Sequence, residues 1–235
     1  MTTAIKTNWI SIAGTGGTYD AYLALPPAGS GPGIVLFQEI FGVNEHIRTL
    51  AEQYALDGFV VLAPDVFWQQ QPRVELGYVG EDMQRAVALM NGADRAALLR
   101  DIGDSVGALR ARPEIGSRKV GAMGYCMGGR LAYLAAATAG VDATVCYYGG
   151  GIHDQLDRAA SIGCPIQFHY GDVDPNIPLS AVEKVRAAMA GKPAEIHVYR
   201  GANHGFNCWA RGSYHPPSAA LAHGRTLQFL ATNLY

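Results

Sequence analysis

The chain has 235 residues, with 18 lysines and arginines against 20 aspartates and glutamates, which gives a formal net charge of −2 at pH 7. This balance argues against a protein that binds the nucleic-acid backbone or an anionic membrane surface. No stretch reaches the roughly 18 consecutive apolar residues of a membrane-spanning helix, and the N-terminal MTTAIKTNWI lacks the apolar core of a signal peptide, so we expect a cytoplasmic protein.

We expect a single domain over residues 1–235. Apolar residues make up 49% of the chain, which is enough for a large core. The sequence shows no repeat and no low-complexity linker, and its Pro/Gly-rich stretch LPPAGSGPG (25–33) is short enough to be a turn between strands.

Short apolar runs alternate with longer amphipathic segments along the chain. Runs at 5–12 and 18–25 are expected to pair as antiparallel strands. The continuous apolar run GIVLFQ (33–38) is typical of a strand buried on both faces. A helix is predicted at 46–58, where apolar side chains share one face and a glycine follows. After it we expect, in chain order, a strand at 59–64, helices near 81–91 and at 94–111, a strand at 119–123, a helix at 129–139, strands at 142–149 and 164–171, a helix at 178–191, a strand at 195–199 and a helix at 217–233.

This alternation of strands and helices predicts an α/β fold. The central sheet should have about eight strands, be mostly parallel and carry helices on both faces. Sheets of this kind place their functional sites at the carboxyl ends of the strands, so motifs that follow strands directly are the ones to inspect.

The hexapeptide GYCMGG (124–129) follows a predicted strand and precedes a predicted helix. This is the context of a nucleophile elbow, in which a sharp turn exposes one side chain and flanking glycines such as Gly124 and Gly128 relieve crowding. The N-terminus of the following helix favours a thiolate. The alternative is a tight turn with an inert thiol. We interpret Cys126 as the nucleophile and expect plain buried thiols at most of the other cysteines, Cys146, Cys164 and Cys208.

A thiol nucleophile needs a base and a group that orients the base, and in an elbow fold these follow in the order nucleophile, acid, histidine. The loop GDVDPNIP (171–178) offers Asp172 and Asp174, either of which could instead cap the next helix. We favour Asp174, which lies deeper in the loop. The segment RGANHGF (200–206) follows the last predicted strand directly and supplies His204 as the base.

Four segments together resemble the dienelactone hydrolase family of α/β-hydrolases, whose type activity is that of a carboxymethylenebutenolidase. They are QEIFGVN (38–44), GYCMGG (124–129), GDVDPNIP (171–178) and NHGF (203–206). The resemblance runs nearly end to end. It implies the α/β-hydrolase fold, a Cys–His–Asp triad and hydrolysis of a small lactone or ester through a thioester intermediate.

The resemblance also implies roles for residues around the triad. Cys126, His204 and Asp174 fall on the triad positions. Glu39 falls on a glutamate that holds the thiol in the free enzyme and helps to generate the thiolate when substrate arrives. The backbone N–H groups of Ile40 and Met127 would form the oxyanion hole. Phe41 and Phe206, in the same motifs, are candidates for substrate binding.

The match departs from the family where a substrate carboxylate would be held. Arginines are expected four residues after the catalytic histidine and shortly before the helix at 84–91, but these positions carry Cys208 and Met83. Arg85 and Arg211 lie nearby and could substitute, or could be solvated surface residues. We therefore expect weaker selectivity for carboxylate-bearing lactones unless one of these arginines restores the clamp.

Two other functions remain open from the sequence. A broad-specificity carboxylesterase or thioesterase could use the same residues on neutral substrates, and a non-catalytic ligand-binding protein could share the fold. The sequence has no P-loop, no G-x-G-x-x-G after a strand and no H-E-x-x-H, so we expect no cofactor and no metal. The expected partner is a small lactone or ester, with no nucleic acid and no membrane, and the chain should be a monomer or a small homo-oligomer.

Overall fold

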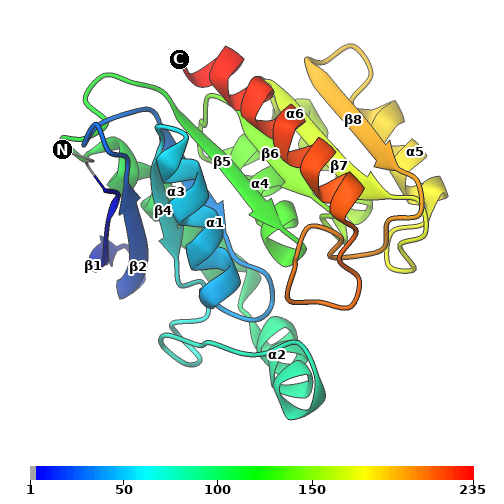
Figure 1. The fold of residues 1–235 in the computed structure, drawn as a ribbon, viewed down its shortest axis with the longest axis horizontal. Coiled ribbons are helices and arrows are strands. Elements are labelled where there is room, and N and C mark those ends of the chain that lie inside the picture. The colour runs from blue at the N-terminus through cyan, green and yellow to red at the C-terminus, as the bar shows by residue number, and fades with distance from the viewer. Residues whose placement is uncertain (1–3) are drawn as a thin grey trace.

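The computed structural model describes residues 4–235 and contains one continuous sheet of eight strands (Figure 1). The strands are β1 (Lys6–Gly14), β2 (Gly17–Leu25), β3 (Gly33–Phe37), β4 (Val60–Pro64), β5 (Val120–Tyr125), β6 (Thr144–Tyr147), β7 (Ile166–Gly171) and β8 (Ala194–Tyr199). Their order across the sheet is β1-β2-β4-β3-β5-β6-β7-β8. β2 pairs antiparallel with β1 and with β4, and all other neighbouring strands are parallel.

Helices cover both faces of this sheet. They are α1 (Glu45–Leu56), α2 (Gly80–Gly92), α3 (Arg95–Arg110), α4 (Met127–Thr138), α5 (Leu179–Ala188) and α6 (Pro216–Leu234), with short 3₁₀ helices at Ile152–Asp154 and Leu156–Ser161. Figure 1 shows α1 and α6 in front of the sheet, α4 behind it, and α2 standing apart beyond the strand ends. Within residues 4–235, none of these helices is both long and apolar enough to cross a membrane.

The architecture confirms the predicted α/β fold with a mostly parallel sheet, and the antiparallel pairing of the first two strands is confirmed. Some boundaries differ for local reasons. The helix predicted at 46–58 ends at Leu56, and Gly58 then adopts a φ of 103° that a helix cannot continue. The strand predicted at 142–149 is only four residues long, because Tyr148 turns away with a φ of 35°. The two 3₁₀ helices were not predicted.

The centre of the sheet is fully enclosed. All residues of β3, β4, β5, β6 and β7 are buried, as expected for parallel strands with helices on both faces. Truncating a core side chain such as Leu36 to alanine would cost about 2–5 kcal/mol of stability. This packed centre fixes the carboxyl ends of β3, β5 and β7, and the loops that follow them carry the candidate site.

Candidate active site

Cys126 occupies the sharp turn between β5, which ends at Tyr125, and α4, which begins at Met127. Its backbone has a φ of 58° and a ψ of −118°, a conformation that residues with a Cβ rarely adopt. The flanking glycines allow the close approach of strand and helix. A Cβ on Gly124 would lie 2.2 Å from the carbonyl oxygen of Gly128, and one on Gly128 would lie 2.1 Å from that of Phe37. Glycine is therefore required at both positions, and the turn projects the Cys126 side chain beyond the sheet.

His204 and Asp174 lie in line with this thiol. His204 Nε2 is 3.1 Å from Cys126 Sγ, and His204 Nδ1 is 2.8 Å from Asp174 Oδ2. The Asp174 side chain is fully buried, and its other oxygen accepts a hydrogen bond of 2.8 Å from the backbone N–H of Asn176. Asp172, the competing acid, instead accepts a hydrogen bond from the backbone N–H of Gly201 at 2.7 Å. The structure thus brings Asp174, rather than Asp172, to His204.

The electrostatics of the His204 side chain favour a charged imidazole. Burial by itself lowers the pKa of His204, but the negative charge of a Cys126 thiolate and the hydrogen bonds that His204 donates to Asp174 and Cys126 outweigh it, so the pKa is raised. The ring edge packs on Tyr148 at a centroid distance of 5.2 Å. The carboxylate would hold the imidazolium beside a Cys126 thiolate. The thiolate could then attack a carbonyl carbon, and the imidazolium could give a proton to the leaving group.

Glu39 lies two residues after β3, which neighbours β5 in the sheet, and is only 1% exposed. Burial raises the pKa of its carboxyl group, against the opposing effects of Arg211 and His204. Its Oε1 accepts from Arg211 Nη1 at 3.3 Å. Within residues 4–235, no hydrogen bond joins Glu39 to Cys126, so the contact that the resemblance implies between carboxylate and thiol is replaced here by an ion pair with Arg211.

Ile40 and Met127 line the same cavity as Cys126 and His204. Met127 is the first residue of α4, so its backbone N–H has no acceptor within the helix. Two such groups directed at one point could stabilise a developing oxyanion.

The cavity has a volume of about 370 Å³ and a mostly apolar lining. Phe41 and Arg211 belong to the lining, as predicted candidates, but two other candidates do not. Arg85 instead donates a hydrogen bond to Gln71, and Phe206 is fully buried against Tyr148 and Tyr199. Met83, which the resemblance placed at a position for an arginine, also belongs to the lining. The sequence reasoning missed several other lining residues: Val87 and Met90 of α2, together with Arg130, Gly150 and Asn176.

Of the missed residues, Arg130 carried the clearest signal, since it directly follows GYCMGG. The missed residues of α2 had no recognisable sequence signal, because the position of α2 at the cavity depends on the conformation of the long loop between β4 and α2.

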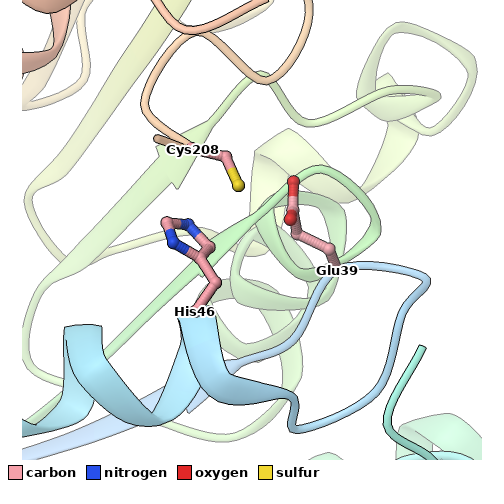
Figure 2. Close-up of side chains that lie close together, drawn as sticks. All are labelled: Glu39, His46 and Cys208. Atoms are coloured by element: carbon pink, nitrogen blue, oxygen red, sulfur yellow. The ribbon is translucent and has the colours of Figure 1, made fainter. Parts of the chain in front are cut away.

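A second group of side chains lies close to Glu39. Glu39, His46 and Cys208 point toward one another in Figure 2 and could together hold a metal ion. His46 lies in the first turn of α1, and Cys208 occupies a position where the resemblance implies an arginine. Both lie at the buried side of the site.

Comparison with known proteins identifies the family of the chain. The model of the dienelactone hydrolase family matches residues 19–234. A protein of Azospirillum brasilense named "Putative carboxymethylenebutenolidase" is 39% identical over 228 residues, which cover 94% of this chain and 96% of that protein. The carboxymethylenebutenolidase of Pseudomonas putida is 34% identical over 218 residues, 92% of each chain.

A solved structure shows the same likeness in three dimensions. The crystal structure titled "Putative Dienelactone Hydrolase" from Klebsiella pneumoniae superposes with a TM-score of 0.87 at 33% identity, and the match covers 97% of this chain and 99% of that one. With the α/β-hydrolase architecture, the strand-end site and these relatives in agreement, the chain belongs to the dienelactone hydrolase family and is a dienelactone hydrolase-like hydrolase.

Proposed function

We propose that the protein hydrolyses a small lactone or ester, as a carboxymethylenebutenolidase does, through a thioester on Cys126. The observation that carries this proposal is the line of contacts from Cys126 Sγ through His204 to the buried Asp174 carboxylate. This line opens into the cavity that holds Ile40 and Met127.

The first half of the reaction breaks the ester bond. The Cys126 thiolate attacks the carbonyl carbon, and the oxyanion that forms is stabilised by the N–H groups of Ile40 and Met127. The tetrahedral intermediate collapses as His204 gives its proton to the leaving oxygen. A thioester to Cys126 remains. If the substrate is a lactone, the leaving oxygen stays part of the acyl group.

The second half releases the acid. Neutral His204, with its Nδ1 proton directed at Asp174, takes a proton from a water molecule at Nε2 while the water oxygen attacks the thioester. The intermediate again places negative charge between Ile40 and Met127. Its collapse expels the Cys126 thiolate and leaves His204 protonated, which restores the starting pair.

Arg211 is the residue we propose for recognition of a substrate carboxylate. It lies three residues after Cys208, off the position expected from the family, yet it lines the cavity and its side chain is only 16% exposed. A carboxylate in the cavity would compete with Glu39 for its guanidinium group. The apolar α2 residues of the lining also suit a neutral ester, which is the second candidate substrate.

The test is hydrolysis of a panel of lactones, aryl esters and thioesters by the wild type and by Cys126→Ala. We expect loss of kcat by about 10⁵–10⁶-fold, as for removal of a nucleophile elsewhere. Alkylation should modify Cys126 first, and Cys164→Ala, which changes another half-buried thiol, should keep full activity. Near-normal turnover by Cys126→Ala would show that the nucleophile is another group. Absence of turnover by the wild type on the whole panel would favour a ligand-binding protein.

A further inference from the structure

Three metal-ligating side chains converge on one point at the buried side of the active site (Figure 2). Glu39 follows β3, His46 belongs to the first turn of α1, and Cys208 lies in the loop between β8 and α6. Their ligand atoms all lie within 4.8 Å of one another. Glu39 is 1% exposed, His46 is 3% exposed and Cys208 is 0% exposed, so all three side chains are buried away from solvent.

Two of the three residues, Glu39 and His46, have buried polar atoms without the hydrogen bonds that such atoms normally have. Within residues 4–235, neither ring nitrogen of His46 has a partner, and Glu39 Oε2 has none either. Leaving such groups unsatisfied costs about 1–3 kcal/mol each, and more for a charged one. An imidazole and a carboxylate oxygen that are both buried without partners and lie close together favour a ligand-binding site at this point.

We propose that Glu39, His46 and Cys208 form a binding site for Zn²⁺. One sulfur, one nitrogen and one carboxylate oxygen are ligands that zinc takes in proteins, with the fourth position open to water. Tetrahedral zinc sets its ligand atoms roughly 3.5 Å apart, so small side-chain rotations would close the observed arrangement around the ion. The mixture of thiolate and imidazole disfavours Mg²⁺ and Ca²⁺, which select oxygen ligands.

Two anionic ligands offset the charge of a bound zinc ion. Zn²⁺ replaces the proton of the Cys208 thiol, which leaves as H⁺, and the thiolate and the Glu39 carboxylate then carry two negative charges against the two positive charges of the ion. With Arg211 beside Glu39, the whole group has a net charge of +1. Arg211 contacts Glu39 through Oε1, so Oε2 is the oxygen left for the metal. The Arg211–Glu39 contact and the metal can therefore occupy different oxygens of one carboxylate.

A surface cavity reaches one of the three proposed ligands. It has a volume of about 310 Å³ and is lined by His46, by Tyr78 and by Trp209, the residue after Cys208. Glu75 belongs to the same lining and adds an acidic group that would favour a cation. Cys126 and His204 line a different cavity, so His46 adjoins a cavity that does not include the triad.

The test is zinc binding by the full chain, stripped with a chelator and titrated against a chromogenic zinc indicator. The wild type should bind one equivalent with release of a proton. Cys208→Ser and His46→Gln should each weaken binding by at least ~100-fold, since loss of even an outer-shell partner costs 10–100-fold. Cobalt in place of zinc should give a thiolate charge-transfer band that Cys208→Ser lacks. Circular dichroism checks that both variants fold.

The decisive control is Cys126→Ser. Cys126 and His204 are another thiol and imidazole in contact, and they could bind zinc by themselves. If the proposal is right, Cys126→Ser keeps the equivalent of zinc and the cobalt band. If Cys126→Ser loses both while Cys208→Ser keeps them, the metal binds at the triad and the proposal is wrong. Failure of the wild type to bind zinc would overturn it as well. None of these readouts depends on hydrolysis, so they are independent of the proposed function.

Discussion

Replacing Asp174 by asparagine should stop catalysis while leaving the protein folded. The Asp174 carboxylate has two separate partners, the backbone N–H of Asn176 at Oδ1 and His204 Nδ1 at Oδ2, each 2.8 Å away. An asparagine has the same shape but only one acceptor oxygen. The N–H of Asn176 can only donate, so it requires that oxygen. The amide NH₂ would then face His204.

This orientation fixes the wrong tautomer of His204. Because the NH₂ group donates, Nδ1 must accept, and the imidazole proton moves to Nε2, where it faces Cys126 Sγ. The imidazole can then no longer take a proton from the thiol or from water. The opposite amide orientation would leave a buried N–H unpaired, at a cost of about 1–3 kcal/mol. We expect kcat to fall by about 10⁴-fold, as for the same exchange in serine proteases, which is about 5.4 kcal/mol of activation free energy.

The assay is steady-state hydrolysis of an activated aryl ester, with thermal unfolding as a check of the fold. Asp172→Asn is the matched control, because Asp172 contacts the backbone of Gly201 and not His204. It should change kcat by less than about tenfold, since it removes no group of the proposed triad. If Asp174→Asn stays within tenfold of the wild type, or if Asp172→Asn is the variant that loses activity, the assignment of the acid is refuted.

Three further predictions concern residues around the triad and in the core. Arg211→Ala should lower kcat/KM for a carboxylate-bearing lactone by on the order of a hundredfold, but should leave kcat/KM for its methyl ester unchanged. The control Arg85→Ala should leave kcat/KM unchanged for both substrates. Equal losses on both substrates in Arg211→Ala would mean that Arg211 has a structural role. Glu39→Gln should lower kcat without unfolding the protein, and an unchanged kcat would remove Glu39 from the mechanism. Burial, with the charges of its neighbours, lowers the pKa of His169 well below 6.5, so the unfolded chain takes up that proton first as pH falls. The contribution of neutral His169 to the free energy of unfolding should be fully present above pH 6.5 and should decrease below that pH by up to ~1.4 kcal/mol per pH unit. Urea unfolding at several pH values should show a smaller decrease for His169→Gln than for the wild type.

The fold could be predicted from the sequence because the patterns that indicate strands, helices and turns are local. The unbroken apolar run at 33–38 marks a strand enclosed on both faces, and glycines around Cys126 mark a turn that no other residue type allows. The acid and the base could be chosen because each follows a strand directly, and parallel strands bring such positions to one edge.

The side-chain contacts around the proposed triad could not be predicted from local patterns. Arg211 reaches Glu39 across 172 residues of sequence only because the loop after β8 folds back over the site. The same loop carries Cys208 to His46, at a spacing that no metal motif describes. Arg85 and Phe206 lay in the right segments, but one points toward Gln71 and the other into the core. Side-chain direction in loops depends on contacts that a linear pattern does not contain.

The backbone of Cys126 has a consequence for any attempt to make this protein more heat-resistant. A residue with a Cβ held at a positive φ of 58° stores about 1–3 kcal/mol of strain, which glycine would not. The substitution that most relieves the turn is therefore Cys126→Gly, which also deletes the thiol. Because Cys126 is the nucleophile we propose, we expect selection for thermal resistance alone to favour loss of activity at this position, so directed evolution of this protein needs a screen for turnover in every round.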